Sequence, residues 1–247
     1  MGRTIIGKVR DGVWQLNEEN YVDSWLVTGR KEAVLIDSLQ YNTDLYDRIR
    51  SITDLPLKVL LTHGHGDHAG RSLEVFAQHD VPVYMDPADG FLTGGLSFHP
   101  LHEGDLFDLG GVVLETISCR GHTPGSAVFL DREREYLFSG DSVGSGGFWL
   151  QLPHSLPLAS FREELIKLMK ITENMKDLRI YPGHRYQSPV QLDRQYLNDE
   201  LDLINDLISG KETSETDVMT AVGQEIVFAR AHRGLLLDFL YDPEKLV

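Results

Sequence analysis

The hydrophobic pattern of the first eighty-five residues changes from short apolar runs to amphipathic stretches and back. Apolar runs bounded by turn residues predict strands at 9–16, 24–28, 33–36, 59–62 and 81–85. The first three form a β-meander pattern. Apolar residues spaced by three and four positions predict helices at 41–52 and 69–78. Strands that alternate with helices in this way indicate an α/β protein.

The second half of the chain repeats one event, in which a short apolar run ends at a polar residue beside glycine. Strands are expected at 112–117, 127–130, 135–138 and 178–181. Amphipathic helices are expected at 161–175 and 193–208. The apolar segments 225–231 and 235–241 fit either a terminal strand pair or a helical cap.

Two segments carry weaker patterns. Residues 87–100 are rich in glycine and aromatic residues, and we expect a mobile surface loop that borders a pocket. Residues 211–217 are polar, and we expect them to be flexible. The length of 247 residues suits one large domain, so we expect a single domain over 1–247, with 191–247 as a C-terminal helix and cap segment.

Composition and charge narrow the class of protein. With 41% hydrophobic and 25% charged residues, the chain is typical of a soluble globular protein. Its 23 basic and 38 acidic residues give a net charge of −15, which disfavours binding to nucleic acid. No apolar run suits a membrane span or a signal peptide, and Cys119 is the one cysteine. We therefore expect a cytoplasmic protein that acts on a small molecule, with a homo-oligomer as an open possibility.

The segment after the apolar run at 59–62 has the highest density of candidate metal ligands in the chain. His63, His65, Asp67 and His68 lie within six residues and are interleaved with two glycines. Glycine lets the backbone fold tightly, so these side chains can converge on one small volume. Imidazole and carboxylate are preferred ligands of zinc and of similar divalent ions. The segment therefore predicts most of a two-metal centre.

Three further apolar runs end at residues of the same type, namely His122, Asp141 and His184. Any one of them alone would be interpreted as a turn residue. Strand ends from one sheet region can meet at one rim, so together they indicate a shared site. Asp37, which ends the run at 33–36, fits either a solvated turn acid or a hydrogen-bond acceptor for the metal-binding loop.

The assembled motifs resemble those of the metallo-β-lactamase-fold hydrolase superfamily, in particular its glyoxalase II-like (hydroxyacylglutathione hydrolase-like) branch. The motifs are LIDS at 35–38, THGHGDHAG at 62–70, GHTPGS at 121–126, SGDS at 139–142 and PGH at 182–184. They follow the order of the family over about 150 residues. The resemblance implies an αββα four-layer sandwich with two metal ions at one edge of the sheets.

The same resemblance implies which residues bind which metal ion. His63, His65 and His122 would hold one ion, and Asp67, His68 and His184 the other, with Asp141 as a bridge. Zinc is the expected metal, and iron or manganese would also suit these ligands.

A pair of such ions lowers the pKa of a bridging water to about 7 and polarises a carbonyl group. The resulting hydroxide would cleave an ester, thioester or lactone bond. Asp67 is expected to be catalytic as well, because it could orient that hydroxide or move its proton.

Three aromatic residues near the expected ligands are candidates for substrate contact. Phe148 and Trp149 follow a glycine-rich loop just after Asp141 and fit one apolar wall of a pocket, with a core role as the alternative. Tyr186 follows His184 by two residues and could donate a hydrogen bond to a leaving group, or simply pack.

Other functions remain open at this point. GHTPGS also resembles a subclass of β-lactamases, so an amide hydrolase is one alternative. A di-iron redox protein and a non-catalytic metal-binding module are further alternatives. The short C-terminal part has no evident basic cluster for the carboxylates of glutathione, and no G-x-S-x-G motif indicates a serine hydrolase.

Overall fold

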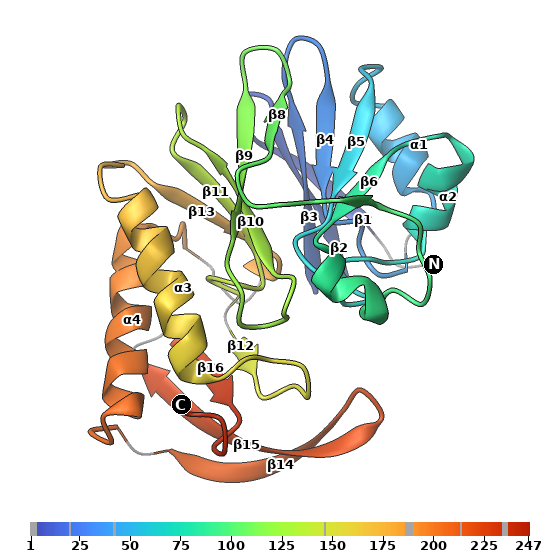
Figure 1. Ribbon diagram of the computed structural model, residues 1–247. Helices are drawn as coiled ribbons and strands as arrows, with labels where there is room; N and C mark the ends of the chain where they lie inside the picture. Colours follow the sequence, from blue (N-terminus) through green and yellow to red (C-terminus); the bar gives the residue numbers. More distant parts are fainter. Residues whose placement is uncertain are drawn as a thin grey trace.

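The computed structural model describes residues 4–19, 21–41, 43–145, 147–185, 190–212, 214–233 and 237–247. The described chain forms two facing sheets with a pair of helices on each outer side, so the α/β four-layer prediction is confirmed (Figure 1). A third, smaller sheet lies below them in this view. None of the described helices is long and apolar enough to cross a bilayer.

The first sheet has seven strands in chain order. They are β1 (Thr4–Arg10), β2 (Val13–Glu18), β3 (Val22–Thr28), β4 (Ala33–Ile36), β5 (Leu57–Leu60), β6 (Val83–Met85) and β7 (His99–Pro100). The pairing is antiparallel as far as β4 and parallel from there on. Parallel neighbours need a crossover, and the helices α1 (Leu45–Arg50) and α2 (Ser72–Gln78) supply the first two. Their apolar faces, including Ile49 and Phe76, pack on the outer side of this sheet.

The second sheet has five strands. In spatial order they are β13 (Arg179–Pro182), β11 (Tyr136–Gly140), β10 (Ala127–Asp131), β9 (Val113–Ser118) and β8 (Leu106–Asp108). The parallel pair β11–β13 is connected through α3 (Leu158–Ile171), which packs with α4 (Arg194–Ile208) on the outer side. Trp25, Phe138 and Tyr181 lie between the two sheets, and the Trp25 indole donates a hydrogen bond to the Pro182 carbonyl at 3.0 Å.

The third sheet is built mainly from the C-terminal part. Its order is β12 (Gly147–Leu150), β16 (Leu237–Tyr241), β15 (Gln224–Arg233) and β14 (Glu215–Ala221). Of the two alternatives for 225–231 and 235–241, the structure therefore has the strand pair. It also adds β14, which begins inside the segment expected to be polar and flexible.

Three expectations for the first half need correction. The strand expected at 9–16 is interrupted by a turn at Asp11–Gly12, where Gly12 has φ +68°, so these residues belong to the two strands β1 and β2. Residues 87–100 are not simply a surface loop, because they contain a 3-10 helix, η1 (Pro87–Leu92), and the edge strand β7. The helix expected from residue 69 begins only at Ser72. A Cβ at Gly70 would lie 1.7 Å from the Leu39 carbonyl oxygen, so the backbone at Gly70 packs closely against the backbone at Leu39 before the helix begins.

Candidate metal centre

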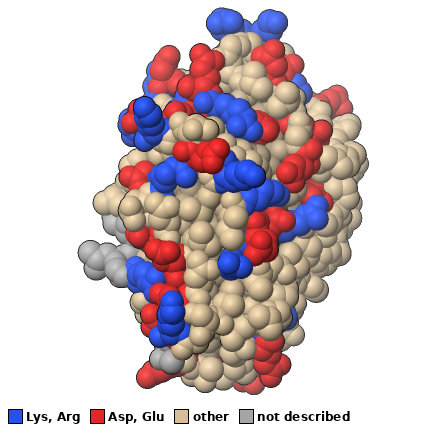
Figure 2. Space-filling model, turned by 60° about the vertical axis from the view of Figure 1, so that its left-hand side comes forward, with Lys and Arg blue, Asp and Glu red and all other residues tan. Residues whose placement is uncertain are grey.

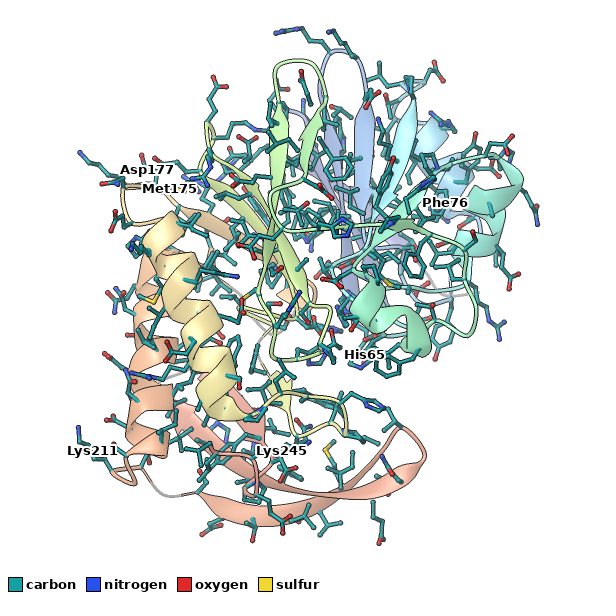
Figure 3. All side chains as sticks on the ribbon, in the orientation of Figure 1. His65, Phe76, Met175, Asp177, Lys211 and Lys245 are labelled. Carbon is teal, nitrogen blue, oxygen red and sulfur yellow. The ribbon has the colours of Figure 1, made fainter. Side chains whose placement is uncertain are left out.

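The seven predicted ligand residues come together at one edge of the two sheets. His63, His65, Asp67 and His68 follow β5, while His122, Asp141 and His184 follow β9, β11 and β13. Because β9, β11 and β13 run in the same direction, their carboxyl ends lie at the same edge. In Figure 3 the labelled His65 lies on the side of the sandwich that faces the third sheet.

The distances between donor atoms match those around a divalent ion. Two nitrogens bound at 2.0–2.1 Å to one tetrahedral ion lie about 3.4 Å apart. Asp141 Oδ1 is 3.4 Å from His68 Nε2, and Asp141 Oδ2 is 3.2 Å from His184 Nε2. Asp67 Oδ2 is 3.5 Å from His184 Nε2. The cluster therefore has the spacing that metal coordination requires.

Three overlapping groups of donors could each hold an ion. They are His63–His65–His122, His63–Asp67–His68 and His68–Asp141–His184, and the donor atoms of each group lie within 4.8 Å of one another. His63 Nε2 is buried and has no hydrogen-bond partner among the described residues. A buried ring nitrogen without a partner is costly, and a bound ion would satisfy it. The residues present therefore fit a metal centre.

Hydrogen bonds at the outer ring nitrogen orient four of the histidines. The partners of Nδ1 are Thr62 Oγ1 for His63 (3.0 Å), Asp37 Oδ2 for His68 (2.9 Å), the Trp149 carbonyl for His122 (2.6 Å) and the Tyr21 carbonyl for His184 (2.6 Å). Each bond leaves Nε2 directed at the cluster, which is the arrangement that second-shell partners impose on metal-binding histidines.

Asp37 is the most connected of these outer partners. It is buried and accepts hydrogen bonds from the Thr62 backbone N–H at 2.8 Å and from the Thr62 hydroxyl. Its backbone has φ +62°, a region that non-glycine residues seldom adopt. Of the two alternatives for Asp37, the structure has the hydrogen-bond acceptor.

Asp89 in η1 joins two loops of the centre, and the sequence pattern did not indicate it. Its buried carboxylate accepts hydrogen bonds from the Gly64 N–H at 3.0 Å, the Gly125 N–H at 2.7 Å and the Thr123 hydroxyl at 2.6 Å. These contacts hold the loop after β5 against the loop after β9. No local signal marks Asp89, because its partners are distant in sequence.

The electrostatics separate the cluster into neutral rings and ion pairs. Burial, together with His122, lowers the pKa of His65 to about 3, so this ring is a neutral donor. Burial alone would lower the pKa of His184, but Asp141 and Asp67 raise it to about 10. Burial alone would raise the pKa of Asp141, but His184 and His68 hold it well below its usual range. Without metal, protons on these rings offset the buried carboxylates, as a bound cation would.

A cavity of about 460 Å³ opens beside the cluster. His65, Asp67 and Trp149 are among its lining residues, and no Lys or Arg occurs among the described residues that line it. Tyr21, which sequence reasoning missed, also lines the cavity and packs edge-on against His184 with ring centroids 5.0 Å apart.

The structure divides the three aromatic candidates for substrate contact. Trp149 lines the cavity, but Phe148 is buried and packs against Phe161 and Phe239, so the prediction for Phe148 needs correction. The physical reason is that neighbouring side chains of a strand point to opposite faces. Tyr186 lies outside the described residues.

Residues 18–184 match the family model of the metallo-beta-lactamase superfamily, and the chain belongs to that family. An uncharacterized protein of Aquifex aeolicus is 29% identical over 185 residues, which cover 67% of this chain and 84% of that protein. A hydroxyacylglutathione hydrolase of Francisella tularensis is 25% identical over 177 residues, covering 70% of this chain and 66% of the relative, just under two thirds of its length.

Solved structures show the same fold. A metallo-beta-lactamase from Pontibacter korlensis superposes with a TM-score of 0.67 at 21% identity, over 83% of this chain and all of that chain. TTHA1623, solved in a di-iron-bound form, has a TM-score of 0.55 at 29% identity, over 66% of this chain and 87% of that chain.

Proposed function

We propose that this chain is a dinuclear-metal-dependent hydrolase that cleaves an ester-, thioester- or lactone-type bond of a small molecule. The observation that carries the proposal is the convergence of seven donor side chains in three overlapping groups, two of which include the buried, unpartnered Nε2 of His63. Membership of a superfamily of metal-dependent hydrolases supports it.

The distances between donor atoms support one assignment of ligands to two ions. His63, His65 and His122, which form one donor group, would hold the first ion. Asp67, His68 and His184, whose donor atoms lie 3.4–3.9 Å apart, would hold the second. Asp141 would lie between them, since its Oδ2 is 3.6 Å from His122 Nε2 and 3.2 Å from His184 Nε2. One carboxylate within reach of both groups of rings is what a bridging ligand requires.

When bound, two such ions would lower the pKa of a coordinated water to about 7 and polarise a carbonyl group. The Asp67 carboxylate lines the cavity, and its neighbours His68 and His184 keep it ionised. It is therefore placed to orient a water in the cavity by accepting a hydrogen bond from it. The Asp37 and Asp89 carboxylates hold the loops that carry these groups and do not touch the cavity.

Zinc is the metal we propose, because the donor set is nitrogen-rich and suits a borderline ion. Iron is the alternative, and the di-iron form of the structure with 29% identity supports it. The hydroxyacylglutathione hydrolases among the relatives support a thioester as substrate class.

The test starts from protein freed of metal by a chelator and reloaded with zinc, iron or manganese. Metal content is measured per chain, and hydrolysis is followed on a panel of thioester, lactone, β-lactam and phosphodiester substrates. We expect two ions per chain and hydrolysis of a thioester or lactone, lost on chelation. His63→Asn should lose both, whereas His102→Asn, an exposed histidine outside the cluster, should lose neither.

Two outcomes would contradict the proposal in different ways. Two bound ions without hydrolysis across the panel would make the chain a metal-binding module. Fewer than one ion per chain under every loading condition would remove the metal centre itself.

A further inference from the structure

The hairpin of β14 and β15 reaches the mouth of the cavity from outside the segment that matches the family model. In Figure 1 it runs along the lower edge of the molecule, beneath the ends of the strands. Ala221 and Gln224 pair across its tip, which leaves Val222 and Gly223 as a two-residue turn. Ala221 and Val222 line the same cavity as His65 and Asp67.

Val222 is an unfavourable residue for this turn. Both central residues have positive φ, +47° for Val222 and +79° for Gly223, as in a type I′ turn. That turn favours Asn-Gly, because a β-branched side chain fits poorly at positive φ. Burial does not offset the strain, since Val222 remains 67% exposed. Local folding therefore does not explain why valine stands here, and such strain is found where a side chain serves a site.

Apart from the histidines and carboxylates of the cluster, much of the described cavity lining is apolar. Trp149, Leu152 and Ala221 line the cavity together with Val222. The described lining residues offer no Lys or Arg to pair with an anionic substituent. An uncharged apolar group suits this surface, because it would cover exposed apolar side chains without needing a polar partner.

We propose that Trp149, Leu152 and the hairpin tip form a subsite for a neutral, apolar substituent of the substrate, and that Val222 is a specificity residue of this subsite. This inference rests on the proposed function and narrows its substrate class. The substrate would be an ester, thioester or lactone with an alkyl or aryl group, rather than a thioester with free carboxylates.

The activity test uses the metal-loaded full chain and p-nitrophenyl esters of acetate, butanoate, hexanoate and hemisuccinate. The wild type should prefer hexanoate to acetate and should turn over hemisuccinate poorly. Val222→Asn should lower kcat/KM for hexanoate by about 3- to 10-fold, as expected for lost contacts in a hydrophobic pocket. Acetate should change by less than about twofold, because it is too short to reach the tip.

Val218→Asn is the matched control. Val218 lies on the same hairpin, is 55% exposed, pairs with Val227 and does not line the cavity. This variant should leave the hexanoate-to-acetate ratio unchanged. An equal loss on all esters in both variants would assign the hairpin a structural role and overturn the subsite.

Two readouts do not depend on hydrolysis. Val222→Asn relieves the turn, so its unfolding temperature should equal or exceed that of the wild type. The methyl NMR signals of Val222 should shift when 2-octanone, an unreactive ketone with a hexyl group, is added, and those of Val218 should not. Shifts without any ester hydrolysis would leave the subsite standing and reject the hydrolase, whereas hydrolysis with an unchanged ester ratio in Val222→Asn would do the opposite.

Discussion

The two turns that border the cavity are built in opposite ways. The loop His63–His68 is held on several sides, since Asp37 binds Thr62 and His68 while Asp89 binds the Gly64 N–H. The positive φ of Asp37 is thereby stabilised by buried hydrogen bonds. At the hairpin tip, Val222 also has positive φ, yet its side chain is mostly exposed.

This difference separates two tasks. Donor atoms must keep their positions within tenths of an ångström, so their supports are buried and redundant. A wall that only excludes water and touches an apolar group can lie on an exposed hairpin. Changes in the first turn should therefore affect metal and activity together, whereas changes in the second should affect selectivity alone.

The largest effect is expected for Asp141, the residue proposed to bridge the two ions. Asp141→Asn removes one anionic oxygen from the centre and should reduce the metal content and lower kcat/KM by more than about 100-fold, since outer partners alone contribute about 10–100-fold. Metal analysis and steady-state kinetics measure both. Asp54→Asn, on the exposed surface, is the control. Full activity with two bound ions in Asp141→Asn would contradict the expectation that changes at the donor residues affect metal binding and activity together.

A smaller loss of metal affinity is expected when a hydrogen-bond partner of a donor residue is changed. Asp37→Asn keeps the shape of the side chain but weakens the hydrogen bond to His68 Nδ1 and should lower metal affinity by about 10–100-fold. Competition with a chromogenic chelator measures this. Unchanged affinity would mean that the loop is held without Asp37.

Asp89→Ala tests whether the link between the two loops supports the fold. It leaves the Gly64 and Gly125 N–H groups without their acceptor, and unmet buried donors cost about 1–3 kcal/mol each. We expect the free energy of unfolding in urea to fall by about 2 kcal/mol or more. Asp86→Ala, which removes a hydrogen bond of η1 to Ala88, should cost less.

The smallest effect on activity is expected for Glu200 on α4, which bears on stability instead. It is fully buried, and neither carboxylate oxygen has a hydrogen-bond partner among the described residues. Burial raises its pKa well above the usual 4.5, so it is neutral when folded and ionises on unfolding. Above pH 4.5 the unfolded chain binds fewer protons, so this residue lowers stability as pH rises, by at most about 1.4 kcal/mol per pH unit.

Glu200→Gln removes the ionisable group and with it this loss of stability at higher pH. The variant should gain in unfolding temperature relative to the wild type as pH is raised from 5 to 8, and calorimetry at several pH values measures the gain. A constant difference across that range would show that Glu200 does not titrate on unfolding. Activity should not change, because Glu200 lies outside the cavity lining.

The sequence predicted the convergence of the seven donor side chains better than the residues around them. The seven donors each follow a short apolar run, and strand ends that share an edge bring such residues together. The residues that hold the donor loops in place and line the cavity were less predictable. Asp89 accepts hydrogen bonds from loops that lie 25 and 36 residues away in the sequence. Trp149 and Phe148 are neighbours on one strand, and the sequence did not indicate which of the two faces the cavity and which faces the core.

The C-terminal sheet was harder to predict for a different reason. Apolar runs there fit a strand or a helix equally well, and pairing with β12 decided between them. The role proposed for Val222 can be inferred only when its backbone angle and its place at the cavity are both known.

Strand β12 gives the protein a constraint on how it can diverge. The main chain of Trp149 anchors His122, its side chain faces the cavity, and its strand pairs in parallel with β16. A lineage that exchanged its C-terminal segment would have to supply a new edge partner for β12 or lose the orientation of one imidazole. Insertions at the hairpin tip would carry no such penalty, so the proposed subsite could change there while the seven donor residues and their supports are inherited unchanged.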